Sequence, residues 1–322
     1  MSIAIYPALG NTTGLGHLKR CIAIGKSLQK LSFNVKFLVD DALFSDLIQK
    51  EGFSYLNISE TSSKRFDLII VDRYDITNQL LRALKNKCNL LARNDDRYPE
   101  MFVDLISDIV LNGNPYGNIE EYIGLVKKGC KIIAGRDFIP MDEVFCRLRN
   151  DFYIKDKLSN LVITFGGSNN MDYPTAIIQE ILKYELFDKI FVLNGESLKD
   201  KFGYNLDTRI KLLPFQERVD EIFSVADLVI CSASTTCWQL STIGIPFIAF
   251  QTASNQAKGF QYINYKRIGI ALKIEEINNG TLIKTIRNLD KSSRLTLYQT
   301  SRNDIPCDGA KRITDQLVKL MN

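Results

Sequence analysis

A short glycine-rich segment carries the only histidine among the 322 residues of the chain. Imidazole titrates near neutral pH, so His17 can take a proton from water as a general base. Gly14 and Gly16 allow a sharp turn and the close approach of a ligand, and Lys19 and Arg20 can attract an anion. A structural or surface histidine is the alternative. It is less favoured here because His17 stands at a strand-to-helix connection, where α/β proteins place ligand sites.

The elements around this segment follow the order strand, loop, helix. Residues 3–5 form an apolar run that predicts a strand, residues 7–13 a connector, and the apolar spacing of residues 21–28 predicts a helix. The N–H groups and positive dipole end at such a helix start favour an anion. Position 19 is lysine where the dinucleotide-binding pattern G-x-G-x-x-G has its third glycine, so that pattern is not matched. We expect no cofactor.

Length and composition indicate a two-domain globular protein. A chain of 322 residues is long for one domain, and its hydrophobic fraction of 45% and charged fraction of 24% are ordinary. The net charge of +4 gives no indication of nucleic-acid binding, although a mildly basic cleft suits a small anionic substrate. Seven cysteines are scattered without a C-x-x-C pair, so we expect neither a metal site nor a disulfide framework. The sequence sets no oligomeric state, and a monomer is compatible with it.

No targeting or membrane segment is predicted. The chain opens on a strand pattern without the basic and long apolar regions of a signal peptide, and no apolar run reaches the length of a membrane span. We therefore expect a cytoplasmic protein in a reducing environment.

Short apolar runs alternate with helical patterns along the chain, which predicts an α/β protein with parallel sheets covered on both faces. Predicted strands are residues 3–6, 35–39, 68–71, 89–92, 109–111 and 131–134, then 161–165, 189–193, 210–212, 228–231 and 247–250. Predicted helices lie near 17–30, 42–51, 77–87 and 118–127, then 173–184, 217–225, 235–243, 255–267, 280–290 and 308–321. We expect an N-terminal domain at 1–135, a linker with a helix at 136–158, and a C-terminal domain at 159–322, whose last helix is a candidate to pack on the N-terminal domain.

Two turns of small residues follow predicted strands in the second half. One contains Gly166, Gly167 and Ser168, and the other spans residues 232–236. Their hydroxyl and backbone N–H groups can hold a diphosphate. The alternative for each turn is capping of the next helix by serine or threonine. The presence of two such turns in one domain favours the anion site.

Other polar side chains also follow predicted strands. Asn255 and Gln256 offer amides that can bind sugar hydroxyls or N-acetyl groups, although an ordinary polar loop is the alternative. In the first half, Asp72, Tyr74 and Asp96 follow two successive strands and can line a cleft, although such positions also serve as caps or salt bridges.

Taken in order, these segments resemble one family. They are Gly14-Leu15-Gly16-His17, Val71-Asp72-Arg73-Tyr74, Phe165-Gly166-Gly167-Ser168, Ser232-Ala233-Ser234-Thr235-Thr236-Cys237-Trp238-Gln239, Gly244-Ile245-Pro246, Asn255-Gln256 and Asp308-Gly309-Ala310-Lys311-Arg312. The set resembles the PseG-type nucleotide-sugar hydrolases of pseudaminic acid biosynthesis, with SpsG-type spore-coat polysaccharide proteins as relatives. The resemblance covers nearly the whole chain. It implies a GT-B-like fold, with two Rossmann-like domains facing across a cleft, related to the MurG glycosyltransferases.

The resemblance also implies an activity and a site. The implied substrate is UDP-2,4-diacetamido-2,4,6-trideoxy-β-L-altropyranose, hydrolysed with inversion by water attack at the anomeric carbon. His17 would be catalytic on the sugar side, and the nucleotide would bind the C-terminal domain. With the residues argued above, the expected substrate-binding set is Gly14, Gly16, Lys19, Arg20, Asp72, Tyr74, Asn255 and Gln256. The expected nucleotide-binding set is Gly166, Gly167, Ser168, Ser234, Thr235 and Gln239.

Two positions depart from the family pattern. Arg73 stands where Val-Asp-His-Tyr is common, so any role of that second histidine is absent. Gln239 stands where the family has a glutamate that is expected to accept hydrogen bonds from both ribose hydroxyls. An amide accepts through its carbonyl and carries no charge. The identity of the nucleotide therefore stays open.

The residues suit hydrolysis of a nucleotide sugar. A nucleoside diphosphate is a good leaving group, so the reaction needs a base for water and positive electrostatics for the phosphates, and no strong general acid. His17 can supply the base, and helix N-termini with Lys19 or Arg20 the electrostatics. The alternative is a GT-B glycosyltransferase for surface polysaccharide synthesis, because a fold does not fix a function. A binding protein without activity is a third hypothesis, against which the presence of His17 argues.

Overall fold

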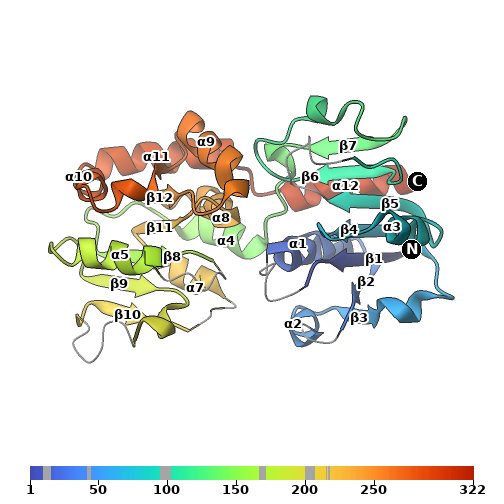
Figure 1. Ribbon diagram of the computed structural model, residues 1–322, viewed down its shortest axis with the longest axis horizontal. Coiled ribbons are helices and arrows are strands. Elements are labelled where there is room, and N and C mark those ends of the chain that lie inside the picture. The colour runs from blue at the N-terminus through green and yellow to red at the C-terminus, as the bar shows by residue number, and fades with distance from the viewer. Residues whose placement is uncertain are drawn as a thin grey trace. The chain divides into compact units, whose positions relative to one another are not determined.

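Figure 1 shows a computed structural model of the chain, which describes residues 1–9, 16–41, 45–94, 103–166, 172–199, 207–214, 216 and 218–322. The chain divides into two compact units. Unit 1 is Met1–Glu143 together with Asp308–Asn322, and unit 2 is Val144–Cys307. We had expected divisions at 135 and 159. The structure divides the chain at 143 and again at 307, so the last fifteen residues return to unit 1.

Within the described ranges, unit 1 holds a seven-stranded parallel sheet in the order β3-β2-β1-β4-β5-β6-β7. Its strands are β1 (Ser2–Pro7), β2 (Asn34–Val39), β3 (Ser54–Asn57), β4 (Phe66–Asp72), β5 (Cys88–Asn94), β6 (Ile109–Asn112) and β7 (Lys131–Ala134). Its helices are α1 (Gly16–Lys30), α2 (Ser45–Lys50), α3 (Asn78–Lys85) and α12 (Gly309–Met321), with the 3₁₀ helices η1 (Ile58–Thr61), η3 (Ile119–Tyr122) and η4 (Arg136–Phe138).

Both faces of this sheet are buried, because alternate side chains of each strand enter different clusters. Ile3 and Ile5 of β1 pack with α1 and with Ile313 and Leu317 of α12. Ala4 and Tyr6 pack on the opposite face, with Leu81 and Leu84 of α3. Each fully buried leucine or isoleucine contributes about 1.5–3 kcal/mol. Gly309 starts α12 where a Cβ would lie 2.0 Å from the Ile139 carbonyl oxygen, so only glycine fits there.

Unit 2 holds a six-stranded parallel sheet among its described residues, in the order β10-β9-β8-β11-β12-β13. Its strands are β8 (Asn160–Thr164), β9 (Lys189–Val192), β10 (Ile210–Leu212), β11 (Leu228–Ser232), β12 (Phe247–Phe250) and β13 (Ile270–Leu272). Its helices are α4 (Glu143–Asp151), α5 (Asp172–Ile181), α7 (Val219–Phe223), α8 (Thr235–Ile243), α9 (Ala257–Lys266), α10 (Thr281–Arg287) and α11 (Lys291–Asp304), with the 3₁₀ helices η5 (Gly195–Leu198), η7 (Ser254–Gln256) and η8 (Ile274–Glu276).

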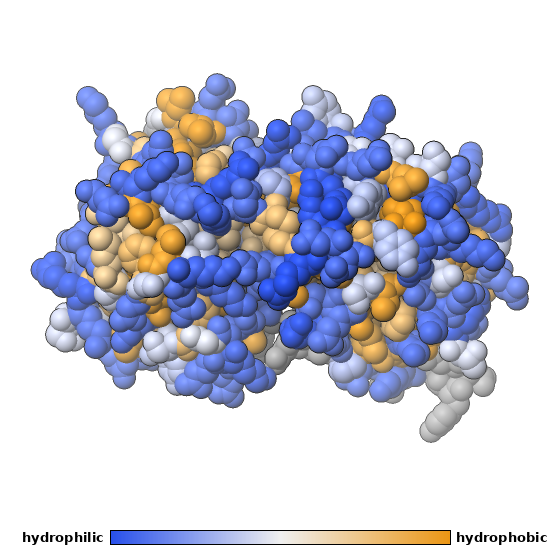
Figure 2. All heavy atoms as spheres, turned by 180° about the vertical axis from the view of Figure 1, so that it is seen from behind, coloured by the Kyte–Doolittle hydropathy of each residue, from blue (hydrophilic) through white to orange (hydrophobic). Residues whose placement is uncertain are grey.

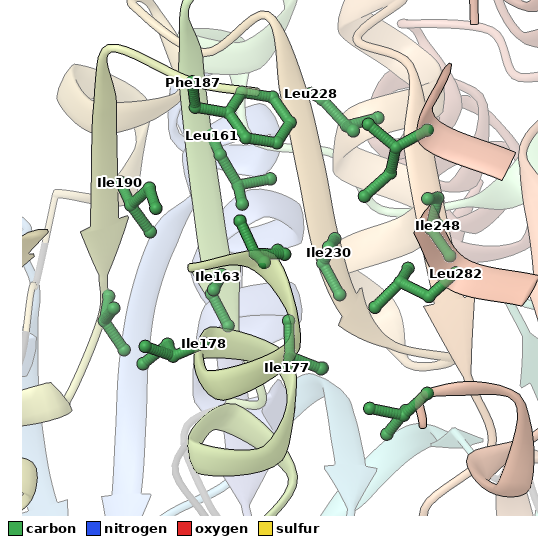
Figure 3. Close-up of a cluster of buried hydrophobic side chains, with 14 of the residues drawn as sticks. Leu161, Ile163, Ile177, Ile178, Phe187, Ile190, Leu228, Ile230, Ile248 and Leu282 are labelled. Carbon is green, nitrogen blue, oxygen red and sulfur yellow. The ribbon is translucent and has the colours of Figure 1, made fainter. Parts of the chain in front are cut away.

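The core of unit 2 lies between its sheet and its helices (Figure 3). Ile177 and Ile178 of α5 lie close to Ile163 of β8, and Leu282 of α10 lies beside Ile248 of β12. These side chains are almost completely buried. Polar residues cover most of the surface seen in Figure 2, and the apolar residues there form separate areas. Within the described ranges, no helix is both long and apolar enough to cross a membrane.

The predicted α/β class with two parallel sheets is confirmed, and a few elements differ. The sequence pattern missed strands β3 and β13 and helix α11. The helix predicted at 118–127 is only the single 3₁₀ turn η3, followed by Gly124 at φ 84°. A left-handed glycine ends a helix, so the apolar spacing of that segment does not continue as one.

Candidate functional site

His17 is the second residue of α1 and is buried, with 5% of its surface exposed. Gly14 lies outside the described residues. Gly16 is exposed, and among the described residues no heavy atom comes within 4 Å of where its Cβ would be. Among the described residues, nothing therefore gives a steric reason for glycine at position 16.

Asp72 is the buried carboxylate beside His17. The register of β1 with β4 pairs Pro7 with Asp72, which brings the end of β4 to the sheet edge from which the chain runs on toward α1. The His17 Nδ1 atom lies 2.8 Å from Asp72 Oδ1, and Asp72 is only 1% exposed. Because an ionised carboxylate only accepts, Nδ1 carries the proton in this bond. The Nε2 lone pair of His17 is then left to act as a base.

Arg20 binds the same carboxylate from one helical turn further along α1. Its Nε and Nη2 atoms lie 2.5 and 2.6 Å from Asp72 Oδ2 and Oδ1. Nη2 also lies 2.9 Å from His17 Nδ1, but Nδ1 cannot both accept from arginine and donate to aspartate. We assign the bond to Asp72, because a carboxylate is the stronger acceptor. Arg20 and His17 are thus two donors that share one oxygen.

This arrangement sets the charge of Asp72. Burial alone would raise the pKa of Asp72, but the Arg20 charge and the hydrogen bonds from Arg20 and His17 hold it well below its usual range. The carboxylate is therefore ionised wherever the protein is folded near neutral pH. Burial and the nearby Asp72 raise the pKa of the Cys21 thiol, whose Sγ lies 3.4 Å from Asp72 Oδ2. That thiol stays protonated and donates to the same carboxylate.

Tyr74 covers His17 from the loop after β4. The two rings meet edge to face, with centroids 4.7 Å apart and planes at 80°. Tyr74 is 37% exposed, so it lies between the buried histidine and solvent. Lys19 lies on α1 between Leu18 and Arg20, and its Nζ is 3.5 Å from a Glu51 carboxylate oxygen.

Arg73, where the resembled family has histidine, joins the ends of three strands. Its guanidinium forms a bidentate pair with Asp75 at 2.8 Å, reaches Asp40 Oδ2 at 2.5 Å, and lies over the Tyr6 ring. The Tyr6 hydroxyl also donates to Asp40. Burial alone would lower the pKa of Arg73, but the hydrogen bonds to Asp75 and Asp40 raise it. The arginine therefore stays charged and fixes the backbone between Asp72 and Tyr74.

In unit 2, the first predicted anion turn follows β8. Gly166 has φ 74°, a left-handed conformation that favours glycine, and its carbonyl accepts a 2.8 Å hydrogen bond from Asn194 Nδ2. Asn194 follows β9, so a neighbouring strand end holds the start of this turn. Gly167 and Ser168 lie outside the described residues.

The second predicted turn leads into α8. Ser234 is its N-cap residue, but its side chain forms no capping hydrogen bond, so the capping alternative does not account for this serine. Its hydroxyl instead accepts from Ser232 Oγ at 3.1 Å. Thr235 is exposed at the helix start. The side chain of Gln239, half-buried one turn later, hydrogen-bonds to none of the residues that the structure describes.

Gln256 is held in one orientation at the turn after β12. Its Oε1 atom accepts from the Thr252 backbone N–H at 2.8 Å and from Thr252 Oγ1 at 3.2 Å. A backbone N–H can only donate, so the amide oxygen must face it and the NH₂ group faces other partners. Gln256 therefore presents donors to any ligand here. Its neighbour Asn255 is exposed.

The structure thus brings His17, Arg20, Asp72 and Tyr74 together in unit 1, and it places the Lys19 ammonium near Glu51. Among the described residues, no three histidine, cysteine, aspartate or glutamate side chains group as a metal site requires. Sequence reasoning named Asp72 and Arg20 as substrate contacts and missed their pairing. It also missed Thr252, Asn194 and the Arg73 cluster, although the departure at Arg73 was a visible signal. The expected roles of the site residues stay predictions.

Comparisons with known proteins agree with the two-sheet fold. Residues 161–317 match the glycosyltransferase family 28 C-terminal domain. The chain is 24% identical to the UDP-2,4-diacetamido-2,4,6-trideoxy-beta-L-altropyranose hydrolase of Campylobacter jejuni, over 76% of this chain and 89% of that protein. It is 21% identical to the spore coat polysaccharide biosynthesis protein SpsG of Bacillus subtilis, over 98% of this chain and 97% of that one.

The solved structures decide the fold. The crystal structure of Acinetobacter baumannii MurG superimposes with a TM-score of 0.68 at 13% identity, covering 99% of each chain. Spinosyn rhamnosyltransferase SpnG with thymidine diphosphate gives 0.64 at 13% identity, covering 99% of this chain and 100% of the other. The chain has the GT-B fold. With the family 28 match, this supports an enzyme of the GT-B class.

Proposed function

We propose that this GT-B protein hydrolyses a UDP-linked diacetamido-trideoxy sugar, in the biosynthesis of a nonulosonic acid such as pseudaminic acid. The observation that carries the proposal is the buried pair of His17 Nδ1 and Asp72 Oδ1 at 2.8 Å. A histidine oriented in this way by a carboxylate is suited to act as a general base, because the imidazolium that forms is stabilised. Unit 1 would act on the sugar and unit 2 would hold the nucleotide. We also propose a cytoplasmic location.

The proposed hydrolysis needs no reactant other than water and the nucleotide sugar. His17 Nε2 takes a proton from water as the water oxygen bonds to the anomeric carbon. The bond from that carbon to the phosphate oxygen breaks, and the nucleoside diphosphate leaves with the electron pair. Asp72 stays ionised and supports the imidazolium through the Nδ1 hydrogen bond. The proton on His17 then returns to solvent.

Unit 2 offers groups for the leaving diphosphate and the ribose. The uncapped start of α8 has Ser234 and Thr235 where helix N–H groups favour an anion. Gln239 lies one turn later and can accept from a ribose hydroxyl. The donors of Gln256 suit the carbonyl oxygen of an acetamido group. The relative from Campylobacter jejuni is named for hydrolysis of a diacetamido sugar, which supports the same substrate class.

Isotopically labelled water shows whether the bond to the anomeric carbon or the bond to phosphorus breaks. In oxygen-18 water, we expect the label on the anomeric oxygen of the free sugar at the earliest time points, before exchange with solvent. A parallel sample of the free sugar alone measures that exchange. Label in the terminal phosphate of the nucleotide would mean attack at phosphorus, and the proposed mechanism would be wrong.

A glycosyltransferase remains the second candidate, and one surface observation favours it. Val103, Leu105 and Ile123 are each more than half exposed. They lie on two segments of unit 1 that pair through Asp104 and Val126. Exposed apolar side chains of this kind can contact an apolar acceptor. Release of free sugar at full rate without an acceptor supports the hydrolase, whereas turnover that requires an added acceptor supports the transferase.

A further inference from the structure

Arg20 was expected to meet the substrate, yet the structure turns its donors inward. Its side chain is 12% exposed, and Nε and Nη2 donate hydrogen bonds to the two carboxylate oxygens of Asp72 at 2.5 and 2.6 Å. A forked arginine–carboxylate pair fixes the plane of the carboxylate as well as its charge. Asp72 therefore cannot rotate about its last bond without breaking this pair.

The fixed carboxylate acts on His17 through a single atom. Asp72 Oδ1 accepts from both Arg20 Nη2 and His17 Nδ1, while Oδ2 accepts from Arg20 Nε and the Cys21 thiol. If the carboxylate turned, Nδ1 would lose its acceptor. The ring could then carry its proton on Nε2, which would leave no base on the other side.

We propose that Arg20 is a positioning residue that sets the tautomer of His17. By holding Asp72 in one orientation it keeps the proton on Nδ1 and the lone pair on Nε2. The kinetic consequence rests on the proposed function, but the tautomer itself can be measured without substrate. Lys19 supplies a matched comparison, because it is the preceding cation on α1 and lies near Glu51 instead.

The chain suits a direct measurement because it has one histidine. Ring-labelled nitrogen-15 histidine gives one pair of ring signals, whose shifts show which nitrogen carries the proton when the ring is neutral. We expect protonated Nδ1 and bare Nε2 in the parent protein. Arg20→Lys keeps the charge but loses the fork, and it should shift the population toward protonated Nε2. Lys19→Met should leave the spectrum unchanged.

Kinetics supply the second readout. We expect Arg20→Lys to lower kcat by about 10- to 100-fold, the range that follows loss of a hydrogen-bond partner that orients a metal-bound histidine, with KM within about twofold. Arg20→Met removes the charge as well and leaves Asp72 buried without its ion pair. Far-UV circular dichroism should therefore be recorded to check that this variant folds. If that variant does not fold, the measurements on Arg20→Lys alone decide the result.

Two results overturn the inference. A parent spectrum with the proton on Nε2 would mean that Nδ1 accepts from Arg20, and Asp72 would not set the tautomer. A spectrum and a kcat like those of the parent in Arg20→Lys would mean that the two-point pairing of Arg20 with Asp72 is not needed to set the His17 tautomer. A shifted tautomer in Arg20→Lys, in a protein that releases no sugar from any nucleotide sugar, supports the positioning role while it removes the proposed function.

Discussion

The strand ends of the two units carry polar groups of different kinds. In unit 1 the ends of β2 and β4 carry ionised side chains that pair with one another or with α1, as in the Arg73–Asp40 and Asp72–Arg20 pairs. In unit 2 the ends of β8, β9, β11 and β12 carry glycine, hydroxyl and amide groups, and the first turn of α8 has no charged side chain. Paired charges hold His17, the proposed catalytic group, in place, whereas hydroxyls and amides depend on a ligand to complete their hydrogen bonds. Substitutions in unit 1 should therefore change rate or stability, and those in unit 2 should change binding.

The largest effect should follow from His17→Asn. Asparagine keeps a polar group but removes the titratable base, so turnover should fall by about 10²–10⁴-fold. UDP affinity should stay near that of the parent, because its proposed contacts lie in unit 2. Steady-state kinetics and calorimetry with UDP measure the two quantities. Near-normal turnover would make His17 structural and end the proposed contrast between the units.

Asp72→Asn should be the most destabilising of these changes. It removes the buried ion pair between Asp72 and Arg20, and breaking such a pair typically costs about 3–5 kcal/mol. The Asp72 pKa is lowered in the folded protein, so the ion pair stabilises above the unfolded-state pKa of about 4 and its contribution is lost as pH falls below that value. The difference in stability between parent and variant should therefore shrink in acid.

Urea unfolding followed by far-UV circular dichroism at neutral and acid pH tests this prediction. The only tryptophan, Trp238, is in unit 2, so its fluorescence provides an internal control that should change little. A stability difference that grows as pH falls would contradict the assignment of an ionised Asp72.

Gln256→Glu replaces the donating NH₂ group that is proposed to face the sugar, and it adds a negative charge. One carboxylate oxygen keeps the Thr252 bonds, and the other replaces the donating NH₂ group. Loss of one hydrogen bond should lower kcat/KM for an acetamido sugar by about tenfold, or about 1.4 kcal/mol. Asn255→Asp adds the same charge one residue earlier and controls for repulsion of the diphosphate. Equal losses in both variants would mean that charge alone is responsible.

The smallest effect should come from Gln239→Glu. A carboxylate can accept from two ribose hydroxyls with charge-assisted bonds, but it also repels the phosphates. We expect UDP to bind more tightly by about 1 kcal/mol. Removal of the ribose 2′-hydroxyl should weaken binding more in the variant than in the parent. Calorimetry with UDP and 2′-deoxy-UDP checks this, and equal sensitivity in both proteins would place Gln239 away from the ribose.

The apolar pattern of the sequence was sufficient for the fold class, and its failures have local causes. Helix α11 escaped prediction because it is largely polar and its most buried large side chain is Arg294, which donates to the carbonyls of Lys155 and Asp156. Strand β3 is a half-buried edge strand of mixed polarity, and β13 has only three residues. These elements form through tertiary packing, which the apolar periodicity of the sequence does not encode.

The candidate site was predictable to the level of strand ends. His17 and Asp72 were each predicted to follow an apolar strand, and parallel strands end at a common edge. That they bind each other follows from side-chain directions, which a single sequence does not encode. The same holds for Gln256, whose amide orientation depends on Thr252 four residues earlier. The sequence named candidate residues, and the structure gives their hydrogen-bond partners.

The two-part construction of unit 1 has a consequence for synthesis on the ribosome. Ile313 and Leu317 of α12 complete the apolar cluster that contains Ile3 and Ile5, yet all of Val144–Cys307 is translated before them. At roughly 5–20 residues per second, the nascent first stretch waits on the order of ten seconds for this helix. Unit 2 is continuous, and all of its residues are synthesised during that interval. The sequence of the later unit is therefore complete before α12 is made, and the apolar surface that awaits α12 is one that a chaperone can hold.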